Sequence, residues 1–190
     1  MEKKHTARQS YCLRKTPHGP AAVLWSLHQD RPRILRVLIS RPGVTARRRL
    51  EALFPDFIAS SCAEVDLVAD GILAFLIGED ITFSLDIARM DLCSPFQERV
   101  LRAEHGIPRG RVSTYQRIAR HIGSAPAARA VGTALANNPF PIMIPCHRAV
   151  RFDGTLGGYQ GGLKMKRSLL EMEGMSFTAS GRVVTEEFFY

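Results

Sequence analysis

Glycine and proline recur in the second half of the chain at intervals that leave room only for short helices. Proline lacks the backbone N–H that a helix interior needs, and glycine accepts the left-handed backbone that ends a helix. The intervals predict helices that begin at Pro95, at Tyr115, after Pro126 and at Leu163. The second of these (115–122) and the third (127–136) are joined by about four residues that include Gly123, which is a helix-turn-helix pattern.

Capping residues mark where these helices start. Ser94 is followed three positions later by Gln97, with Pro95 between them, which is the pattern of a capping box with proline at the first helical position. Ser113 or Thr114 is predicted to cap the helix that begins at Tyr115. The third helix is rich in small residues, which let its backbone approach either another helix or a nucleic-acid groove. Arg129 is its only charged side chain.

The first half has a different pattern and predicts an α/β unit over residues 1–90. The expected elements are strands at 9–13, 23–27 and 34–39, a short helix capped by Thr45 and a helix over 63–77. Polar turns separate the strands, so they are expected to form an antiparallel meander. Leu50, Leu53 and Phe54 are predicted to share the inner face of the short helix. Nothing in this half suggests chemistry.

Arginine dominates the positive charge of the chain. The 26 Lys and Arg residues, 21 of them Arg by our count, face 18 acidic residues, for a net charge of +8. Residues 99–167 hold 12 basic and 2 acidic side chains, so the excess of +10 is concentrated there. Because the planar guanidinium suits phosphate, this block favours a nucleic-acid partner over a merely solvated basic face.

The cysteines and the apolar runs exclude several classes of protein. The four cysteines, at positions 12, 62, 93 and 146, show neither a C-x-x-C spacing nor a metal-ligand spacing. We therefore expect free thiols, a cytoplasmic location, no metal and no cofactor. No run approaches the roughly 18 apolar residues of a membrane span, and no secretory signal is expected.

One segment carries a candidate nucleophile. Pro139, Pro141 and Pro145 predict an extended run that ends at Cys146, with His147 next to it. Cysteine reacts as the thiolate, which the neighbouring imidazole and the guanidinium of Arg148 would favour. Consecutive side chains point apart, so His147 is expected to act through a water or a tight turn. A buried structural thiol is the alternative interpretation.

Two features downstream suggest a pocket around this cysteine. The loop 157–162 contains four glycines but lacks the Gly-Lys-Ser/Thr ending of a phosphate loop, so it suggests backbone amides approaching a flat ligand. A mobile surface loop is the alternative. Glu173 is predicted at a helix C-terminus, where the helix dipole disfavours a carboxylate. Such a position is tolerable if Glu173 has a partner, and His147 is the obvious candidate.

From Ser94 to Met175 the chain resembles the O6-alkylguanine-DNA alkyltransferases, the methylated-DNA–protein-cysteine methyltransferases. The motifs that carry the resemblance are Arg129-Ala130-Val131-Gly132, Asn138-Pro139, Ile144-Pro145-Cys146-His147-Arg148, Gly158-Tyr159-Gln160-Gly161-Gly162 and Leu169-Leu170-Glu171-Met172-Glu173-Gly174. The resemblance implies an α/β N-terminal domain (1–90), a mainly α DNA-binding and alkyl-acceptor domain with a helix-turn-helix (91–175), and a C-terminal tail (176–190).

The resemblance also implies a function: direct, stoichiometric repair of O6-alkylguanine, and of O4-alkylthymine, by a monomer that binds the minor groove of double-stranded DNA and flips the damaged base. Cys146 would accept the alkyl group, His147 would take its proton through a water, Glu173 would hold His147, and Tyr115 would donate to the leaving guanine. The resemblance implies that DNA is bound by Arg129, Ala130, Gly132, Thr133 and Ala136. It implies that the substrate pocket is lined by Leu135, Asn138, Val150, Tyr159 and Gln160.

The chain departs from the family pattern at a few positions, and other functions compete with repair. Thr114 stands where many relatives have Ser, Leu101 where an aromatic residue is common, and Gln160 where Ser or Arg is common, so the tolerated alkyl size is open. The cysteine cluster that binds zinc in some relatives is absent. The competing functions are a lesion binder without transfer, which Cys146 argues against; a transcription regulator, which the alanine-rich helix argues against; and a thiol hydrolase using Cys146, His147 and Glu173.

Overall fold

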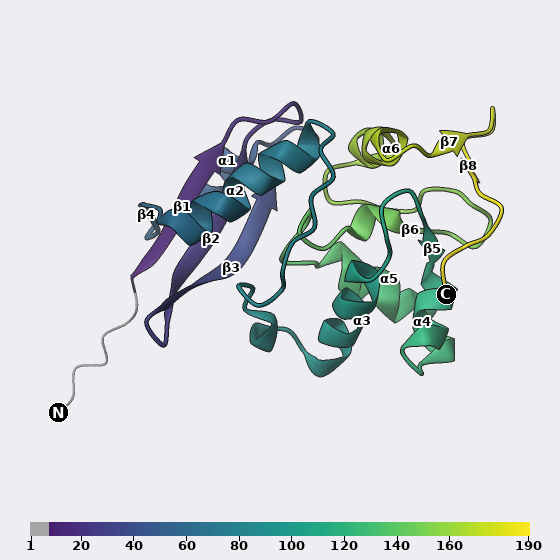
Figure 1. Cartoon of the computed structure of the whole chain (residues 1–190), viewed down its shortest axis with the longest axis horizontal. Coiled ribbons are helices and arrows are strands. Elements are labelled where there is room, and N and C mark those ends of the chain that lie inside the picture. The colour runs from purple at the N-terminus through teal and green to yellow at the C-terminus, as the bar shows by residue number, and fades with distance from the viewer. Residues whose placement is uncertain (1–7) are drawn as a thin grey trace.

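The structure is a computed structural model that describes residues 8–190. It consists of an α/β part at the N-terminal end and a mainly helical part that follows it (Figure 1). Both parts of the predicted fold class are therefore confirmed. A single large hydrophobic core runs through both parts, from Val23 in the sheet to Leu169 in the last helix. The predicted boundaries at residues 90 and 175 stay a prediction, and residues 1–7 lie outside the described residues.

The N-terminal sheet has four strands in the order β3-β2-β1-β4. Their bounds are β1 Gln9–Arg14, β2 Ala21–His28, β3 Arg31–Ile39 and β4 Ile58–Ala59. The first three strands form the predicted antiparallel meander, and β4 adds in parallel beside β1. Gln29 and Asp30 make the two-residue turn between β2 and β3, with φ of 51° and 58°. Positive φ at both positions matches the twist of the flanking strands.

Helices cover both faces of this sheet. Alternate residues of β2 point to opposite faces, so Val23 packs in the large core with α2 (Ala63–Leu76) and Leu24 packs with α1 (Ala46–Leu53). Thr45 caps α1 as predicted. The prediction that Leu53 lies on the inner face is wrong, because Leu53 is 60% exposed while Leu50 is buried. Leu53 is the last residue of α1, and Phe54 after it packs on the same side as Leu50.

The second part contains the predicted short helices, here α3 (Pro95–His105), α4 (Tyr115–His121) and α5 (Ala128–Ala136). Ser94 caps α3 and Thr114 caps α4, each by accepting a backbone N–H. The capping box is incomplete, because the Gln97 amide donates to the carbonyl of Ala134 on α5 and to that of Asn137, the residue after this helix. Gly123, with φ of 71°, ends the first helix of the helix-turn-helix. Its left-handed backbone lets the chain reverse toward α5.

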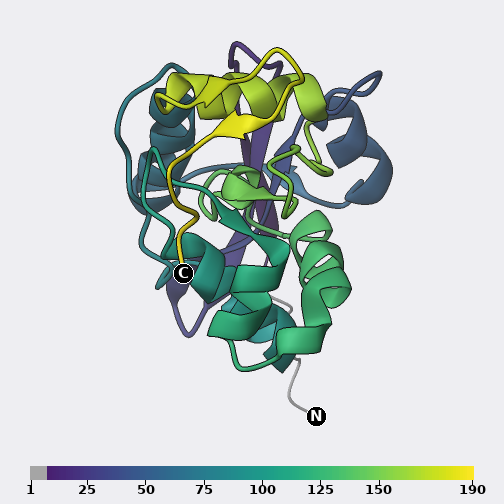
Figure 2. The ribbon, with the colours of Figure 1, turned by 90° about the vertical axis from the view of Figure 1, so that its right-hand side faces the viewer.

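Short elements complete this part of the chain. They are the 3-10 turns η1 (Met90–Leu92), η2 (Ala125–Ala127) and η3 (Cys146–Arg148), the strands β5 (Ser113–Thr114), β6 (Ala149–Val150), β7 (Ser176–Phe177) and β8 (Val183–Val184), and the helix α6 (Leu163–Met172). The last residues return to α4, where the Tyr190 ring stacks on His121 with 3.7 Å between ring centroids. Figure 2 shows this segment descending from α6 to the helix-turn-helix.

The edge of the N-terminal sheet holds the segment that leads into the candidate nucleophile. The free edge of β3 donates the Val37 N–H to the Pro139 carbonyl at 2.8 Å, and the Ile34 N–H to the Ile87 carbonyl at 2.8 Å. An exposed strand edge would leave these groups unpaired. The N-terminal sheet therefore fixes the position of the turn that follows Pro139. No helix within residues 8–190 is long and apolar enough to span a membrane.

Candidate active site

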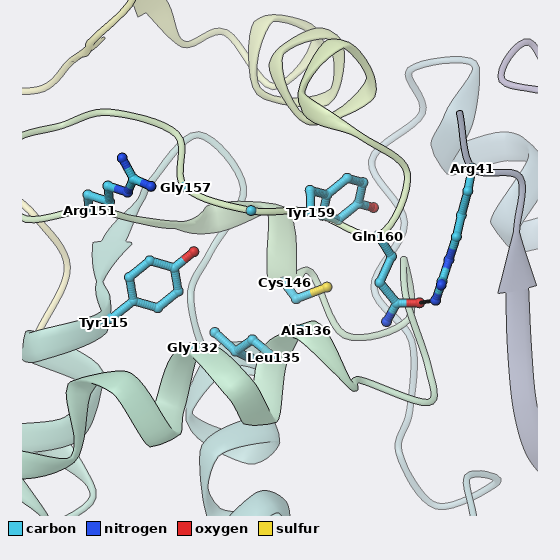
Figure 3. Close-up of a pocket in the computed structure, with 11 residues that line it drawn as sticks. Arg41, Tyr115, Gly132, Leu135, Ala136, Cys146, Arg151, Gly157, Tyr159 and Gln160 are labelled. Carbon is cyan, nitrogen blue, oxygen red and sulfur yellow. Dashed lines mark hydrogen bonds between the residues drawn. The ribbon is translucent and has the colours of Figure 1, made fainter. Parts of the chain in front are cut away.

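A cavity of about 500 Å³ opens beside Cys146. Residues from three regions line it: Tyr115 with the inner face of α5, Arg151 with the glycine-rich loop, and Arg41 from the N-terminal part. Figure 3 shows Cys146 between Tyr115 on one side and Gln160 on the other. The Cys146 side chain is therefore at the wall of a cavity, although only 5% of the residue is exposed to solvent.

The segment before Cys146 is a tight turn, and the prediction of an extended run is wrong. The Ile144 N–H donates to the Phe140 carbonyl at 2.9 Å, and Ile142 has a φ of 75°. This conformation is costly for a β-branched residue and persists only when the surroundings fix it. The Asn138 side chain supplies part of that constraint by accepting from Phe140 N at 2.9 Å and donating to Ile144 O at 3.1 Å.

His147 lies in the 3-10 turn after Cys146 and is fully buried. Its Nε2 is 2.8 Å from Glu173 Oε1. Arg148 also binds Glu173, with Nε to Oε2 at 2.9 Å and Nη2 to Oε1 at 2.8 Å. The helix-end carboxylate thus has two partners, of which the sequence suggested only His147.

These contacts fix the ionisation of Glu173 and the tautomer of His147. Burial alone would raise the pKa of Glu173, but the hydrogen bonds and charges of His147 and Arg148 lower it to about 2. Because Glu173 is then a carboxylate, His147 Nε2 carries the proton that it accepts. His147 Nδ1 is left with a lone pair, and it is a buried nitrogen with no hydrogen-bond partner among the described residues.

The thiol of Cys146 is protonated in the free protein. Burial raises the pKa of Cys146 to about 12, although the Asn138 side chain favours the thiolate. The expectation that the adjacent guanidinium stabilises the thiolate is wrong, because Arg148 turns away to Glu173. Within residues 8–190 no hydrogen bond joins Cys146 to His147.

Tyr115 begins α4 and points its hydroxyl toward Gly157 (Figure 3). Burial raises the pKa of Tyr115 to about 12, so the phenol is a proton donor at neutral pH. A Cβ on Gly157 would lie 2.7 Å from the Tyr115 hydroxyl oxygen, and Gly157 has a φ of 65°. Glycine is therefore required at this point of the loop, both for its backbone and for the space that Tyr115 occupies.

A buried lysine holds the glycine-rich loop to the rest of the site. Lys166 on α6 is fully buried, and its Nζ donates to the carbonyls of Ala149 at 2.6 Å, Leu156 and Gly158. Burial lowers the pKa of Lys166 to about 8. The three acceptors belong to β6 and to the loop, so a single ammonium ties α6, β6 and the cavity wall together.

The sequence-predicted residues fall into three groups around the cavity. Tyr115, Gly132, Leu135, Ala136, Cys146, Tyr159 and Gln160 line it. His147, Glu173 and Asn138 are buried and do not line the cavity. Arg129, Ala130 and Thr133 are exposed on the outer face of α5.

Two of the predicted pocket residues do not line the cavity. One is Asn138, whose side chain is buried in the turn before Cys146, and the other is Val150. It is fully buried in a separate small core with Val112 and Leu170, so its prediction as a pocket residue is wrong. Its backbone pairs with Thr114 in the two-stranded β5–β6 sheet. Because side chains alternate along a strand, the neighbouring position, not Val150, faces the other side of that sheet.

Four residues near the site were missed by sequence reasoning. Arg41 and Arg151 line the cavity, Lys166 holds the loop, and Glu104 on α3 is fully buried with no hydrogen-bond partner for either carboxyl oxygen among residues 8–190. The sequence contains a signal for Glu104 and Lys166, since each is a charged residue on the otherwise apolar face of a helix. The residues around Arg41 in the sequence give no indication that it lies at the site. No group of three or more His, Cys, Asp or Glu side chains within the described part of the chain is placed to hold a metal.

Comparison with known proteins gives a consistent set of matches. Residues 95–175 match the family model for the DNA-binding domain of 6-O-methylguanine DNA methyltransferase. The methylated-DNA–protein-cysteine methyltransferase of Methanothermobacter thermautotrophicus is 48% identical over 107 residues, which are 56% of this chain and 60% of that protein. Matches to curated relatives of this name thus span about 60% of their length.

Solved structures match over more of the chain. The crystal structure of Mycobacterium tuberculosis O6-methylguanine methyltransferase is 31% identical with a TM-score of 0.68, and the match covers 87% of this chain and 92% of that one. A structure of the Mycobacterium tuberculosis protein in complex with DNA matches with a TM-score of 0.66 over 86% of this chain and 92% of that one, at 31% identity. The likeness therefore includes the N-terminal sheet as well as the helical part.

Proposed function

We propose that this chain, which belongs to the family of methylated-DNA–protein-cysteine methyltransferases, repairs DNA by moving the alkyl group of O6-alkylguanine to its own Cys146. The observation that carries the proposal is the arrangement at the cavity. A cysteine sulfur lies at the wall of a space large enough for a purine, and the next residue in the same 3-10 turn is a buried histidine bonded to a buried glutamate. O4-alkylthymine, which offers the same kind of alkyl–oxygen bond, is a second proposed substrate.

The reaction is a displacement at the alkyl carbon. The Cys146 sulfur forms a bond to that carbon as the bond from carbon to guanine O6 breaks, and the electron pair of the broken bond stays on guanine. His147 Nδ1, which has the free lone pair, takes the thiol proton through a water. Glu173 stabilises the resulting imidazolium, because its carboxylate accepts from Nε2. The thioether is stable, so each molecule reacts once.

Tyr115 is proposed as the acid that serves the leaving base. The departing guanine carries negative charge and gains from a proton donor at the far side of the cavity from the sulfur. Tyr115 holds its proton at neutral pH because burial raises its pKa to about 12. Proton uptake by His147 and proton release by Tyr115 leave the base neutral after transfer.

The outer face of α5 is proposed to enter the minor groove of DNA. Its exposed residues include Ala130, Thr133 and Ala136, whose small side chains permit close approach, and Gly132 on the cavity side. Arg129 is exposed at the start of the helix and is proposed to fill the gap left by the flipped base. Flipping costs a few kcal/mol of stacking, which an inserted side chain partly restores.

We propose a division into a supporting domain over 1–90, a DNA-binding and alkyl-acceptor domain over 91–175 and a tail over 176–190. A monomer acting in the cytoplasm, at the nucleoid in a prokaryote, accords with four cysteines that are all free thiols in this structure. No cofactor is required by the displacement, since the thiol, its base and the acid all come from the chain.

The proposal is tested by incubating the full chain with duplex DNA that contains one O6-methylguanine. We expect the intact mass of the protein to rise by one methyl group and peptide mapping to place the group on Cys146. Cys146→Ala should gain no mass while still binding the duplex. Release of more than one equivalent of product per protein would point to a hydrolase, and the absence of any adduct would refute the function.

Replacing Arg129 with alanine is expected to slow transfer from the duplex by about tenfold, because an unfilled gap makes base flipping less favourable. Transfer from the free base O6-benzylguanine, which needs no flipping, should keep its rate. The matched control is Arg120→Ala, which removes an exposed arginine from the other helix of the helix-turn-helix. Equal slowing on duplex and free base would remove the base-flipping role of Arg129.

A further inference from the structure

The turn between β3 and α1 forms part of the cavity wall although it belongs to the N-terminal part. Arg41 Nη2 donates to Gln160 Oε1 at 2.9 Å, the contact drawn as a dashed line in Figure 3. The other end of the same amide, Gln160 Nε2, donates to the Asn138 carbonyl at 2.7 Å. Both polar atoms of Gln160 are therefore held, one by the N-terminal part and one by the turn that carries Cys146.

Backbone packing holds the two loops together at a second point. Gly162, with φ of 85°, lies against Pro42 so closely that a Cβ on it would be 2.7 Å from Pro42 Cγ. The turn itself is closed by two hydrogen bonds between Arg41 and Val44, at 2.9 and 3.0 Å. Because the backbone of Arg41 is fixed in this way, its guanidinium is presented to Gln160 from a rigid support.

The position of Gln160 bears on which alkyl groups fit. In Figure 3 the Cys146 sulfur points toward the side of the cavity where Gln160 lies. A displacement requires the reacting carbon next to the sulfur and in line with the breaking bond. Any substituent on that carbon would project sideways from that line, toward a wall of the cavity to which Gln160 belongs.

We propose that Arg41 and Gln160 form a latch that sets the size of the alkyl group the cavity accepts. The proposal rests on the proposed function and names a specificity determinant of the same site. With the latch closed, a methyl group fits beside the sulfur. A benzyl group has to displace the Gln160 amide and break its bonds to Arg41 and Asn138, so larger groups react more slowly. Arg41 acts through Gln160 and is a positioning residue.

The test compares two duplexes that differ only in the alkyl group. Single-turnover rates are measured at saturating O6-methylguanine duplex and O6-benzylguanine duplex. Arg41→Ala is expected to raise the benzyl-to-methyl rate ratio about three- to tenfold, the worth of one hydrogen bond. Gln160→Ala should raise the ratio at least as much. Arg41 also lines the cavity, so the double variant separates a direct effect from one exerted through Gln160. It should match Gln160→Ala alone, because the latch assigns the effect of Arg41 to its bond with Gln160.

Arg47→Ala is the matched control, since it removes an exposed arginine from the adjacent helix α1, away from the cavity. It should leave the rate ratio unchanged. Amide hydrogen exchange at residues 159–162 gives a readout independent of chemistry and should speed up in Arg41→Ala but not in Arg47→Ala.

Each outcome decides the matter. An unchanged ratio in Arg41→Ala, or an equal rise in Arg47→Ala, overturns the latch while methyl transfer by the wild type leaves the proposed function standing. Additive effects of the two substitutions in the double variant also overturn it. If the wild type transfers no methyl group, the function itself fails and the latch fails with it.

Discussion

Glu173→Gln is expected to slow alkyl transfer by about 10²- to 10⁴-fold, the range that a positioned acid–base group contributes. The carboxylate holds the proton of His147 on Nε2 and so leaves Nδ1 free to accept the thiol proton. A neutral amide does not stabilise the imidazolium that forms. The measurement is the single-turnover rate of methyl transfer at saturating duplex.

The same substitution is expected to destabilise the fold by about 3 kcal/mol, because Arg148 is left as a buried charge without its counter-ion. The double variant Glu173→Gln with Arg148→Met separates the two effects. It should recover much of the free energy of unfolding in urea without recovering the rate. Recovery of both would show that Glu173 serves only the fold.

Glu171→Gln is the control on the same helix. Glu171 lies two residues earlier, is about half exposed and pairs with Arg167 in an i, i+4 arrangement on the surface. Such pairs are worth little, so stability should change by less than about 0.5 kcal/mol. The rate of transfer should stay that of the wild type.

The secondary structure could be predicted from local signals because those signals are complete within a few residues. Thr114 caps α4 with its own side chain, and Gly123 ends the same helix with its own backbone. The strands β2 and β3 follow from two apolar runs and one polar turn. At Leu53 the prediction fails, because Leu50 and Phe54, four residues apart, occupy the packed side at the end of α1 and Leu53 is left exposed.

The turn before Cys146 shows what proline content alone does not determine. The prolines at 139, 141 and 145 restrict their own φ and the residue before each, which permits either an extended run or a tight turn. Asn138 decides between the two, because its side chain bonds both ends of the turn. The left-handed conformation of Ile142 is a consequence of that constraint and has no signal in its own side chain.

The residues of the candidate site could be predicted where they lie in one recognisable segment. They could not be predicted where the fold brings distant segments together. Cys146 and His147 are adjacent, and Glu173 was marked by its unfavourable place at a helix end. Arg41 comes from a loop more than a hundred residues away, and it reaches Gln160 only because β3 docks against the Pro139 turn. The periodicity of apolar residues predicts the helix or strand to which a residue belongs. It does not predict which other segment of the chain that residue contacts in the fold.

Glu104 is the residue whose burial most strongly conflicts with its chemistry. It is fully buried on α3, and neither of its oxygens has a hydrogen-bond partner among residues 8–190. Burial raises the pKa of Glu104 to about 8, and the charges of Lys166 and Arg148 only partly oppose this. The folded protein therefore keeps this carboxyl protonated at pH 7, whereas the unfolded chain ionises it above its ordinary value of 4.5.

The stability of the wild type should therefore fall as the pH rises from 4.5 to 8. Protonation favours the folded state when the folded pKa is the higher one, so the contribution is complete below 4.5 and lost by about pH 8. His147, whose pKa is lowered by burial, opposes this trend below pH 6.5, and Lys166 opposes it above 8. Between these limits the free energy of unfolding should fall by about 1.4 kcal/mol per pH unit.

Replacing Glu104 with leucine is expected to flatten this slope and to raise the free energy of unfolding at pH 8 by on the order of 2 kcal/mol. The shift from 4.5 to about 8 corresponds to about 5 kcal/mol. At pH 8 the carboxyl is about half ionised, so its removal also takes part of a favourable charge from Lys166 and reduces the gain. Urea unfolding at pH 6.5 and pH 8 measures both quantities. Glu98→Leu, on the partly exposed face of the same helix α3, should keep the wild-type slope. A slope that persists in Glu104→Leu would mean that Glu104 is already ionised in the folded protein, with Lys166 rather than burial controlling its charge.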